Sequence, residues 1–261
     1  MEPLQAIVVA AGHGKRFRSQ ATEPGYPLKA GRRGSPVGVA NGDKPYVLLG
    51  SKPILAHTLE QISRIADVEH ITVVVAPDRV DYCREEVVRR YAICKISRVI
   101  AGGDERPQSV WKGLEALEER SGWVLIHDGV RPFVPLSRIG TLVEKAKETG
   151  AAVLGVSVKP TLKEVDAGGR VARTLDRSRL CEVQTPQVFR LDILHRAYQL
   201  AGMESAKTAT DDAALVEQMG HPVGVVEGDE TNIKITTPFD LEVAEMILTN
   251  SKLEIRSTNK F

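Results

Sequence analysis

The 261-residue chain has few cysteines, almost no net charge and no long apolar run, and each shortage excludes a class of protein. Its three cysteines, Cys83, Cys94 and Cys181, are scattered and form no CxxC pair, so neither a disulfide framework nor a zinc site is expected. The formal net charge of +1 supplies no overall field that would attract nucleic acid or an anionic membrane. No apolar run approaches the ~18 residues that cross a bilayer, and no signal peptide precedes Ala6. We therefore expect a cytoplasmic protein without nucleic acid or membrane partners.

The chain does contain a regular alternation of short β-branched runs with amphipathic stretches. Near-continuous apolar strands separated by helices are typical of a parallel sheet that is covered on both faces. The sequence therefore predicts an α/β fold, Rossmann-like, with a mostly parallel sheet, in a single domain over residues 1–261. The expected strands are Ala6–Ala10, Ile71–Ala76, Ser97–Ile100, Val124–His127, Ala152–Val156 and Val223–Val226, and the expected helices are Ile54–Ile65, Asp81–Tyr91, Ser109–Glu119 and Leu136–Glu148.

Two segments interrupt this alternation. Residues from about 19 to 43 are rich in glycine and proline without any period, which predicts a long inserted loop. Residues from about 161 to 184 contain Gly168-Gly169 between two short alternating runs, which predicts a β-hairpin arm that projects from the main body. Because an isolated two-stranded ribbon is barely stable in water, we expect the arm to pack on a second copy of the chain in a homodimer.

The stretch "AAGHGKRF" delivers glycines and cations to the carboxyl end of the first expected strand. It lacks the third glycine of a dinucleotide fingerprint, because Phe17 stands there, and it is not a Walker phosphate loop. Glycines let backbone N–H groups approach phosphate oxygens, while lysine and arginine offset the phosphate charge. We therefore favour polyphosphate binding over the alternative of a solvated loop. The nearby cations are Lys15, Arg16, Arg18, Lys29, Arg32, Arg33 and Lys44, opposed by Glu23 and Asp43.

The stretch "AGGDERPQS" follows another expected strand, where ligands of parallel sheets bind. Gly103, Asp104 and Ser109 can supply the donors and acceptors that a nucleotide base requires. The alternative is a plain strand-to-helix connection in which Ser109 caps the helix that begins there. We favour base recognition, and Ser109 could also cap the helix.

Two later stretches bring further charged groups. In "HDGVRPF", Asp128 could bind a ribose hydroxyl or a divalent cation and Arg131 a phosphate or hydroxyl, although the two could simply satisfy each other in a turn. His127 falls on the apolar side of the pattern and is interpreted as structural. In "TNIKITTP", Lys234 is placed in a short strand ahead of a helix that starts at Pro238, where it could bind a ligand or protect a sheet edge.

Six stretches taken together resemble one enzyme family over the chain up to about Met246. They are "VVAAGHGKRF" with "DKPYVLLGSKPILAHTL", "AGGDERPQSVWKGL", "LIHDGVRPFV", "QTPQVFRLDIL", "ATDDAALVEQMG" and "VEGDETNIKITTPFDL". In this order they are similar to the 2-C-methyl-D-erythritol 4-phosphate cytidylyltransferases, nucleotidyltransferases of non-mevalonate isoprenoid precursor biosynthesis. The resemblance implies transfer of CMP from CTP to 2-C-methyl-D-erythritol 4-phosphate with release of pyrophosphate.

In such a reaction the phosphate monoester is itself the nucleophile, so catalysis consists of positioning and electrostatic stabilisation. The resemblance implies that Arg16 and Lys44 stabilise the transition state, and that Arg177 and Lys234 aim the attacking phosphate. It also implies a Mg²⁺ ion bound mainly through the CTP phosphates, with no metal site assigned to protein residues. Whether Asp128 contacts that ion is open.

The resemblance extends to the binding residues. The arm is expected to swap between protomers and to carry Arg177 and Thr185 into the neighbour's active site, while Thr161 and Lys163 at its base face the sugar phosphate. Thr210 is a substrate-binding candidate, although Thr210 or Asp211 could instead cap the following helix. The implied nucleotide-binding residues are Ala10, Ala11, Gly12, Gly14, Gly103, Asp104, Ser109, Asp128 and Gly129, and the implied substrate-binding residues are Asp128, Arg131, Thr161, Lys163, Thr185 and Thr210.

The chain departs from the family pattern at two places. Gly129-Val130 stands where members commonly carry two alanines, and Ser19–Asp43 separates Arg16 from Lys44. We expect Lys44 to keep the phosphate role because the residues after it continue in register with the family. The alternative occupants of that role are Lys15, Lys29 and Arg32.

Two other functions compete with this interpretation. A cytidylyltransferase for ribitol 5-phosphate or another polyol phosphate is the nearer one, although its relatives tend to start with Leu-Ala-Gly-Gly where this chain has Val9-Ala10-Ala11-Gly12. A non-catalytic nucleotide-binding regulator is less favoured, because the chain retains the residues that the resemblance implies for the reaction. These are Arg16, Lys44, Asp128, Arg177 and Lys234.

Overall fold

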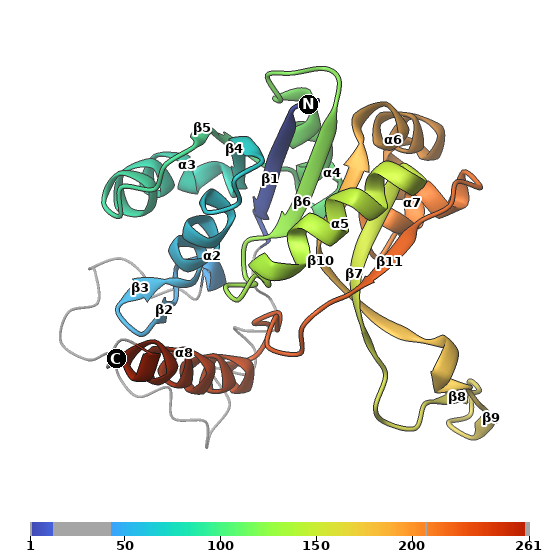
Figure 1. The fold of residues 1–261 in the computed structure, drawn as a ribbon. Helices are drawn as coiled ribbons and strands as arrows, with labels where there is room; N and C mark the ends of the chain where they lie inside the picture. The colour runs from blue at the N-terminus through green and yellow to red at the C-terminus, as the bar shows by residue number, and fades with distance from the viewer. Residues whose placement is uncertain (1, 13–42, 207, 259–261) are drawn as a thin grey trace.

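The computed structural model describes residues 2–12, 43–206 and 208–258, and within them a seven-stranded sheet forms the centre of an α/β fold (Figure 1). The strand order is β11–β7–β10–β6–β1–β4–β5. Neighbours are parallel except at β10, which runs antiparallel to both β6 and β7. The predicted mostly parallel sheet is confirmed, and β10 is an addition to the expected strands. The strands are β1 (Leu4–Ala10), β4 (Val68–Val75), β5 (Ile96–Ala101), β6 (Trp123–Asp128), β7 (Ala151–Ser157), β10 (Cys181–Arg190) and β11 (Gly224–Glu227).

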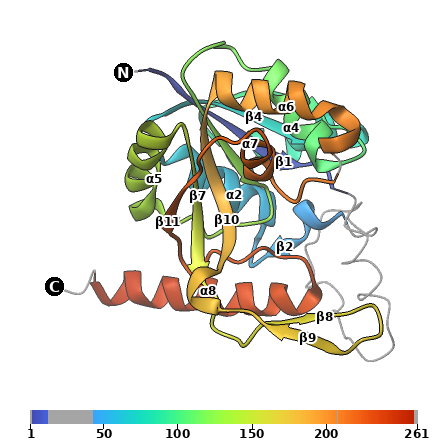
Figure 2. The same cartoon turned by 90° about the vertical axis from the view of Figure 1, so that its right-hand side faces the viewer.

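Helices cover both faces of this sheet, as Figure 2 shows. Successive side chains of a strand point to opposite faces, so Ala6 and Val8 of β1 pack in one core with α2 and α5. Ile7 and Val9 pack in the other core with α4, α6 and α7. The double covering explains why the strands are apolar almost throughout. The helices are α2 (Ile54–Ser63), α3 (Val80–Tyr82), α4 (Arg106–Glu115), α5 (Leu136–Thr149), α6 (Leu191–Ala206), α7 (Asp212–Gln218) and α8 (Pro238–Thr258).

Two of the expected helices differ in detail from the prediction. The helix expected to begin at Ser109 begins at Arg106, because Glu105 caps it in a capping box with Gln108. Ser109 is therefore not the helix cap. The single helix expected over residues 81–91 comprises α3 and a π-helical turn, η3 (Cys83–Arg89).

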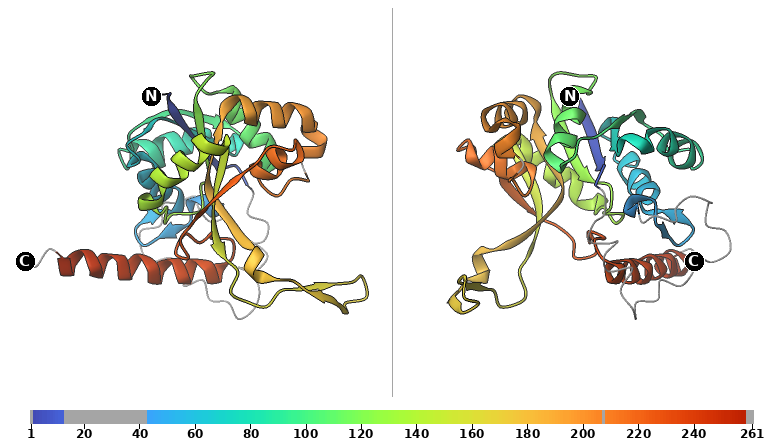
Figure 3. Two further views of the ribbon diagram at one scale, coloured as in Figure 1. Left: turned by 45° about the vertical axis from the view of Figure 1, so that its right-hand side comes forward. Right: turned by 180° about the vertical axis from the view of Figure 1, so that it is seen from behind.

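The predicted hairpin arm is formed by β8 (Lys163–Val165) and β9 (Val171–Thr174), and it projects from the main body (Figures 2 and 3). Every residue of these two strands is exposed. The arm is shorter than predicted, because Cys181–Gln184 already pairs with β7 in the central sheet. The chain thus returns to the sheet through β10 before it reaches Thr185.

The C-terminal helix α8 begins at Pro238, as predicted, and packs beside the short hairpin of β2 (Leu48–Leu49) and β3 (Lys52–Pro53). Leu49, Val130 and Ile235 are buried with residues of α8 in a third small core. Among the described residues, no helix combines the length and apolar character needed to cross a membrane.

Candidate functional site

The carboxyl ends of β1, β4 and β6 meet at one edge of the sheet. Val9 of β1 is in register with Asp128 of β6, and the N–H of Gly129 donates to the carbonyl of Val9 at 2.8 Å. A Cβ atom at position 129 would lie 2.9 Å from Cβ of Ala10, so a side chain here would force one of its neighbours to shift. The predicted residues Ala10, Asp128 and Gly129 therefore lie side by side, followed in the chain by Ala11 and Gly12.

The turn after β5 reaches the same edge. Gly102 donates its N–H to the carbonyl of Val75 at 2.7 Å, and a Cβ atom on Gly102 would lie 2.5 Å from Cβ of Ala11. Ser109 is 1 % exposed, and its Oγ accepts the N–H of Gly103 at 3.1 Å. Ser109 thus shapes the turn beside Ala11, and Asp104 lies exposed on it. The predicted base-binding residues are brought together, while their contact with cytosine stays a prediction.

Asp128 is the centre of a cluster of three cations. Its carboxylate lies 2.9 Å from Nζ of Lys234, 3.3 Å from Nε of Arg106 and 3.4 Å from Nε of Arg131. Burial opposes the charge of Asp128, but Arg106, Lys234 and Arg131 outweigh it and hold the pKa of this carboxyl well below its ordinary value. Asp128 therefore stays ionised, and its pairing with Arg131 is only one part of a larger network.

Arg106 connects this cluster to α7. Its Nη2 lies 2.9 Å from the carboxylate of Asp212, the first residue of α7, which is 1 % exposed. Asp212 also accepts the phenol O–H of Tyr198 on α6 at 2.7 Å. Burial alone would lower the pKa of Arg106, but the charges of Asp212 and Asp128 raise it above its ordinary value. The guanidinium is thus a fixed cation between two carboxylates.

Lys234 and Arg131 are positioned by an irregular segment and not by the strand predicted around Lys234. The N–H of Ile235 donates to the carbonyl of Val130 at 3.0 Å, and Nη1 of Arg131 donates to the carbonyl of Asn232 at 2.8 Å. These two hydrogen bonds hold residues 232–235 against the turn after β6. A β-strand would instead form a continuous ladder of backbone hydrogen bonds with a neighbouring strand. Lys234 therefore reaches Asp128 from a loop.

His127 and Thr185 support Asp128 from behind. The Oγ of Thr185 accepts the N–H of Asp128 at 3.0 Å and lies 3.0 Å from Nδ1 of His127. Nε2 of His127 lies 3.0 Å from the carbonyl of Arg131, and burial lowers the pKa of this histidine to about 4. The structural interpretation of His127 is confirmed. The expectation that Thr185 is carried by the arm into the neighbour's site is wrong for this chain, because Thr185 lies buried in β10 beside Asp128 of its own chain.

The remaining predicted residues lie elsewhere. Lys44 begins the 3-10 turn η1 (Lys44–Tyr46), directly after Asp43. Thr161 and Lys163 are exposed on the arm, where Nζ of Lys163 donates to Thr174 at 2.6 Å. Arg177 begins the arm's 3-10 turn η4 (Arg177–Arg179) and donates to the carbonyl of Lys159.

Thr210 is exposed just before α7, and Asp211, not Thr210, caps that helix by accepting the N–H of Ala214 at 3.0 Å. Gly14, Arg16 and the inserted segment up to residue 42 lie outside the described residues.

Comparison with known proteins decides the family. Residues 28–250 match the family described as IspD: 2-C-methyl-D-erythritol 4-phosphate cytidylyltransferase. The chain belongs to this family. A family enzyme from Alkaliphilus metalliredigens is 42% identical over 249 residues, covering 95% of this chain and 94% of that protein.

Solved structures agree with this membership of the cytidylyltransferase family. The crystal structure of 4-diphosphocytidyl-2C-methyl-D-erythritol synthase from Anaerococcus prevotii matches with a TM-score of 0.76 and 28% identity, over 95% of this chain and 96% of that one. The crystal structure of 2-C-methyl-D-erythritol 4-phosphate cytidylyltransferase from Thermus thermophilus matches with a TM-score of 0.70 and 29% identity, over 95% and 98%.

Sequence reasoning missed three residues of this candidate site, namely Arg106, Asp212 and Asn232. Arg106 stands inside "AGGDERPQS" and Asp212 inside "ATDDA", so both belong to motifs that carry the family resemblance. Asn232 is fully buried and donates from Nδ2 to the carbonyl of Thr185 at 2.9 Å. A charged or amide side chain directly beside a recognised motif residue was the available signal.

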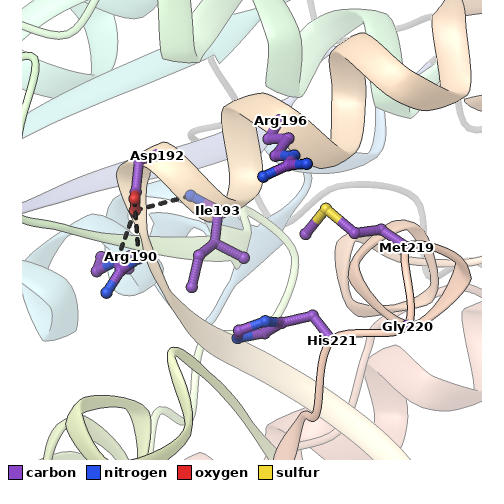
Figure 4. Close-up of a pocket in the computed structure, with 7 residues that line it drawn as sticks. All are labelled: Arg190, Asp192, Ile193, Arg196, Met219, Gly220 and His221. Carbon is purple, nitrogen blue, oxygen red and sulfur yellow. Dashed lines mark hydrogen bonds and ion pairs between the residues drawn. The ribbon is translucent and has the colours of Figure 1, made fainter.

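A separate cavity of about 290 Å³ lies between the start of α6 and the end of α7 (Figure 4). Arg190, Arg196 and His221 are among its lining residues, and Arg190 is in register with Trp123, the first residue of β6. Since Asp128 is the last residue of β6, this cavity lies at the opposite edge of the sheet from the cation cluster.

Proposed function

We propose that this protein transfers the cytidylyl group of CTP to 2-C-methyl-D-erythritol 4-phosphate and releases pyrophosphate. The observation that carries the proposal is the convergence of Arg106, Arg131 and Lys234 on Asp128 at the carboxyl edge of the sheet, in a chain of this family. Ligands of open α/β sheets bind at that edge. Three cations around one carboxylate leave positive charge for a phosphorylated reactant.

The chemistry needs no activated side-chain nucleophile. An oxygen of the acceptor's phosphate monoester forms a bond to the α-phosphorus of CTP, and the bond from that phosphorus to the oxygen bridging to the β-phosphate breaks. The electron pair of that bond leaves with pyrophosphate. Since two polyanions meet and charge gathers around the α-phosphorus, the protein contributes by orientation and by fixed positive charge.

Lys234 is the cation best placed to move from Asp128 to a phosphate. Its side chain is 38% exposed, against 22% for Arg106 and 12% for Arg131. Arg106 is also held by Asp212 and Arg131 by the carbonyl of Asn232. Asp128 therefore keeps two cation partners when Lys234 turns toward the acceptor phosphate, and the buried carboxylate is never left uncompensated.

The family also implies Mg²⁺, and the site can accommodate the ion only in part. Asp128 offers the carboxylate oxygens that Mg²⁺ prefers, but three cations already surround them. Among the described residues, no group of three or more His, Cys, Asp or Glu side chains could hold a metal ion. We propose that the ion is held mainly by the CTP phosphates, where it would offset their charge.

The arm supports a homodimer as the functional unit. Val165 and Val171 on its two strands are 60% and 61% exposed, and a two-stranded ribbon with both faces in water is marginal. A second chain that covers these valines would also bring Arg177 toward a neighbouring site. We further propose that the enzyme is cytoplasmic, and its three free cysteines support this proposal.

A pyrophosphate-release assay tests the proposal. CTP with 2-C-methyl-D-erythritol 4-phosphate and Mg²⁺ is expected to release pyrophosphate, whereas ATP, GTP or UTP with the same acceptor should release far less. Ribitol 5-phosphate with CTP is the matched comparison for the acceptor. Faster turnover with ribitol 5-phosphate would replace the proposed substrate, and CTP binding without release for any polyol phosphate would favour a nucleotide-binding regulator.

A further inference from the structure

An ion pair holds the residue that precedes Lys44. Oδ2 of Asp43 accepts a hydrogen bond from Nε of Arg79 at 2.6 Å and lies 2.5 Å from its Nη2. The two side chains are half-buried, with 21% of Asp43 and 29% of Arg79 exposed. Burial disfavours the charge of Arg79, but the hydrogen bond and charge of Asp43 outweigh it and raise the arginine pKa. The guanidinium of Arg79 therefore stays charged beside Asp43.

Both partners are fixed to the body of the protein. Arg79 ends the 3-10 turn η2 (Pro77–Arg79), which follows β4, the strand parallel to β1. Asp43 accepts the N–H of Tyr46 through its carbonyl at 2.9 Å. Tyr46 is 3% exposed and packs edge-to-face on Tyr82, with 5.1 Å between ring centroids. The backbone of Asp43 is thus held by its own side chain and by the turn that follows it.

The length of the preceding connection shows why this anchor matters. Residues 13–42 separate Gly12, which follows β1 by two residues, from Asp43. An extended chain gains about 3.3–3.6 Å per residue, so the length of this connection alone leaves the position of Lys44 open. Asp43 and Lys44 have Cα atoms only about 3.8 Å apart, so whatever fixes Asp43 fixes the backbone of Lys44.

We propose that Arg79 is a positioning residue for the reaction: by holding Asp43, it fixes the backbone from which Lys44 reaches the phosphates of CTP. This inference rests on the proposed function and on the transition-state role that the family resemblance implies for Lys44. A lysine that stabilises a transition state must be placed to within fractions of an ångström, since a displacement of about 1 Å can cost on the order of a hundredfold in rate. Arg79 itself acts through Asp43.

The test compares Asp43→Asn and Arg79→Gln with the double variant. Each single variant is expected to lower kcat about tenfold, with KM for the acceptor changed less than about twofold, as positioning losses act on the chemical step. The double variant should be no slower than either single one, because each change breaks the same pair. Lys44→Ala sets the reference, with a loss of about a hundredfold. Arg89→Gln, which breaks the exposed pair with Glu85 at 2.9 Å, is the matched control and should keep full activity.

A second readout separates positioning from mere stability and does not need turnover. The acylation rate of the Lys44 amine by an N-hydroxysuccinimide ester, measured by peptide mass spectrometry, should change at least threefold in Asp43→Asn. A fall in Tm with normal kcat per folded molecule and an unchanged acylation rate would overturn the proposal, as would a fully active Lys44→Ala. If the wild-type chain releases no pyrophosphate, the proposed function fails, and the acylation rates still decide whether Arg79 positions Lys44.

Discussion

Nη2 of Arg106 lies 2.9 Å from Oδ2 of Asp212, a carboxylate that is 1% exposed. Because Arg106 also faces Asp128, Arg106→Gln leaves two buried carboxylates without their shared cation, and we expect a loss of about 3–5 kcal/mol in the free energy of unfolding. Urea denaturation measures it. The double variant Arg106→Gln/Asp212→Asn should recover part of this loss, and strictly additive losses would show that the two residues are not coupled.

The buried His127 should make stability depend on pH. The unfolded chain binds a proton at this histidine near the ordinary value of 6.5, whereas burial lowers the pKa in the folded protein to about 4. Between these values the unfolded state binds more protons, so the stabilisation is complete above pH 6.5 and is lost as the pH falls toward 4. The whole effect is about 3 kcal/mol.

Denaturation curves between pH 7.5 and 4.5 measure this slope. His127→Asn should flatten it, because the buried group that titrates is removed. A wild-type slope that persists in His127→Asn would assign the dependence to other groups.

Replacing Lys234 should affect catalysis more than folding. Lys234→Gln removes the most exposed of the three cations around Asp128, and Arg106 and Arg131 continue to compensate that carboxylate. We expect kcat to fall on the order of a hundredfold while Tm changes little, because one fixed donor to the transition state is lost. Lys147→Gln on the outer face of α5 is the control, and equal activity in the two variants would remove Lys234 from the reaction.

The arm valines should control the oligomeric state. Val171→Asp places a charge on a strand of the arm whose side chains are all exposed in the single chain, so folding of the monomer should be little affected. If the arm packs on a second chain, the dimer should dissociate at micromolar concentration, as measured by light scattering after gel filtration. A wild-type chain that is already monomeric would contradict the homodimer.

The elements predicted from periodicity are those whose cause is local. The apolar run of β1 is enough to predict a strand covered on both faces, whatever its neighbours are. In the same way, Pro238 alone marks the start of α8. By contrast, β10 contains Glu182, Gln184 and Pro186 and lacks such a run. It is a strand because β6 and β7 lie on its two sides, which no local pattern reveals.

The same distinction applies to the site. Asp128 was predicted because it ends an apolar strand, where ligands bind. Arg106 was not predicted, because its place in the site depends on its ion pair with Asp212. Only the packing of α6 and α7 brings Asp212 near. The stretch "TNIKITTP" was predicted to place Lys234 in a short strand, but the hydrogen bond from Ile235 to Val130 binds this segment to a turn. Arg16 and Gly14 lie outside the described residues, and their roles stay predictions.

Strand β10 connects the arm directly to the candidate site. The strand leaves the arm at Cys181, where it pairs with Ser157 at the end of β7, and four residues later its Thr185 receives the amide of Asp128. A molecule that binds the arm and displaces it would therefore act on the same strand that holds Asp128 in the candidate site. Mutations that weaken the pairing of Cys181 with Ser157 should therefore change the turnover rate, even though every reacting group is intact.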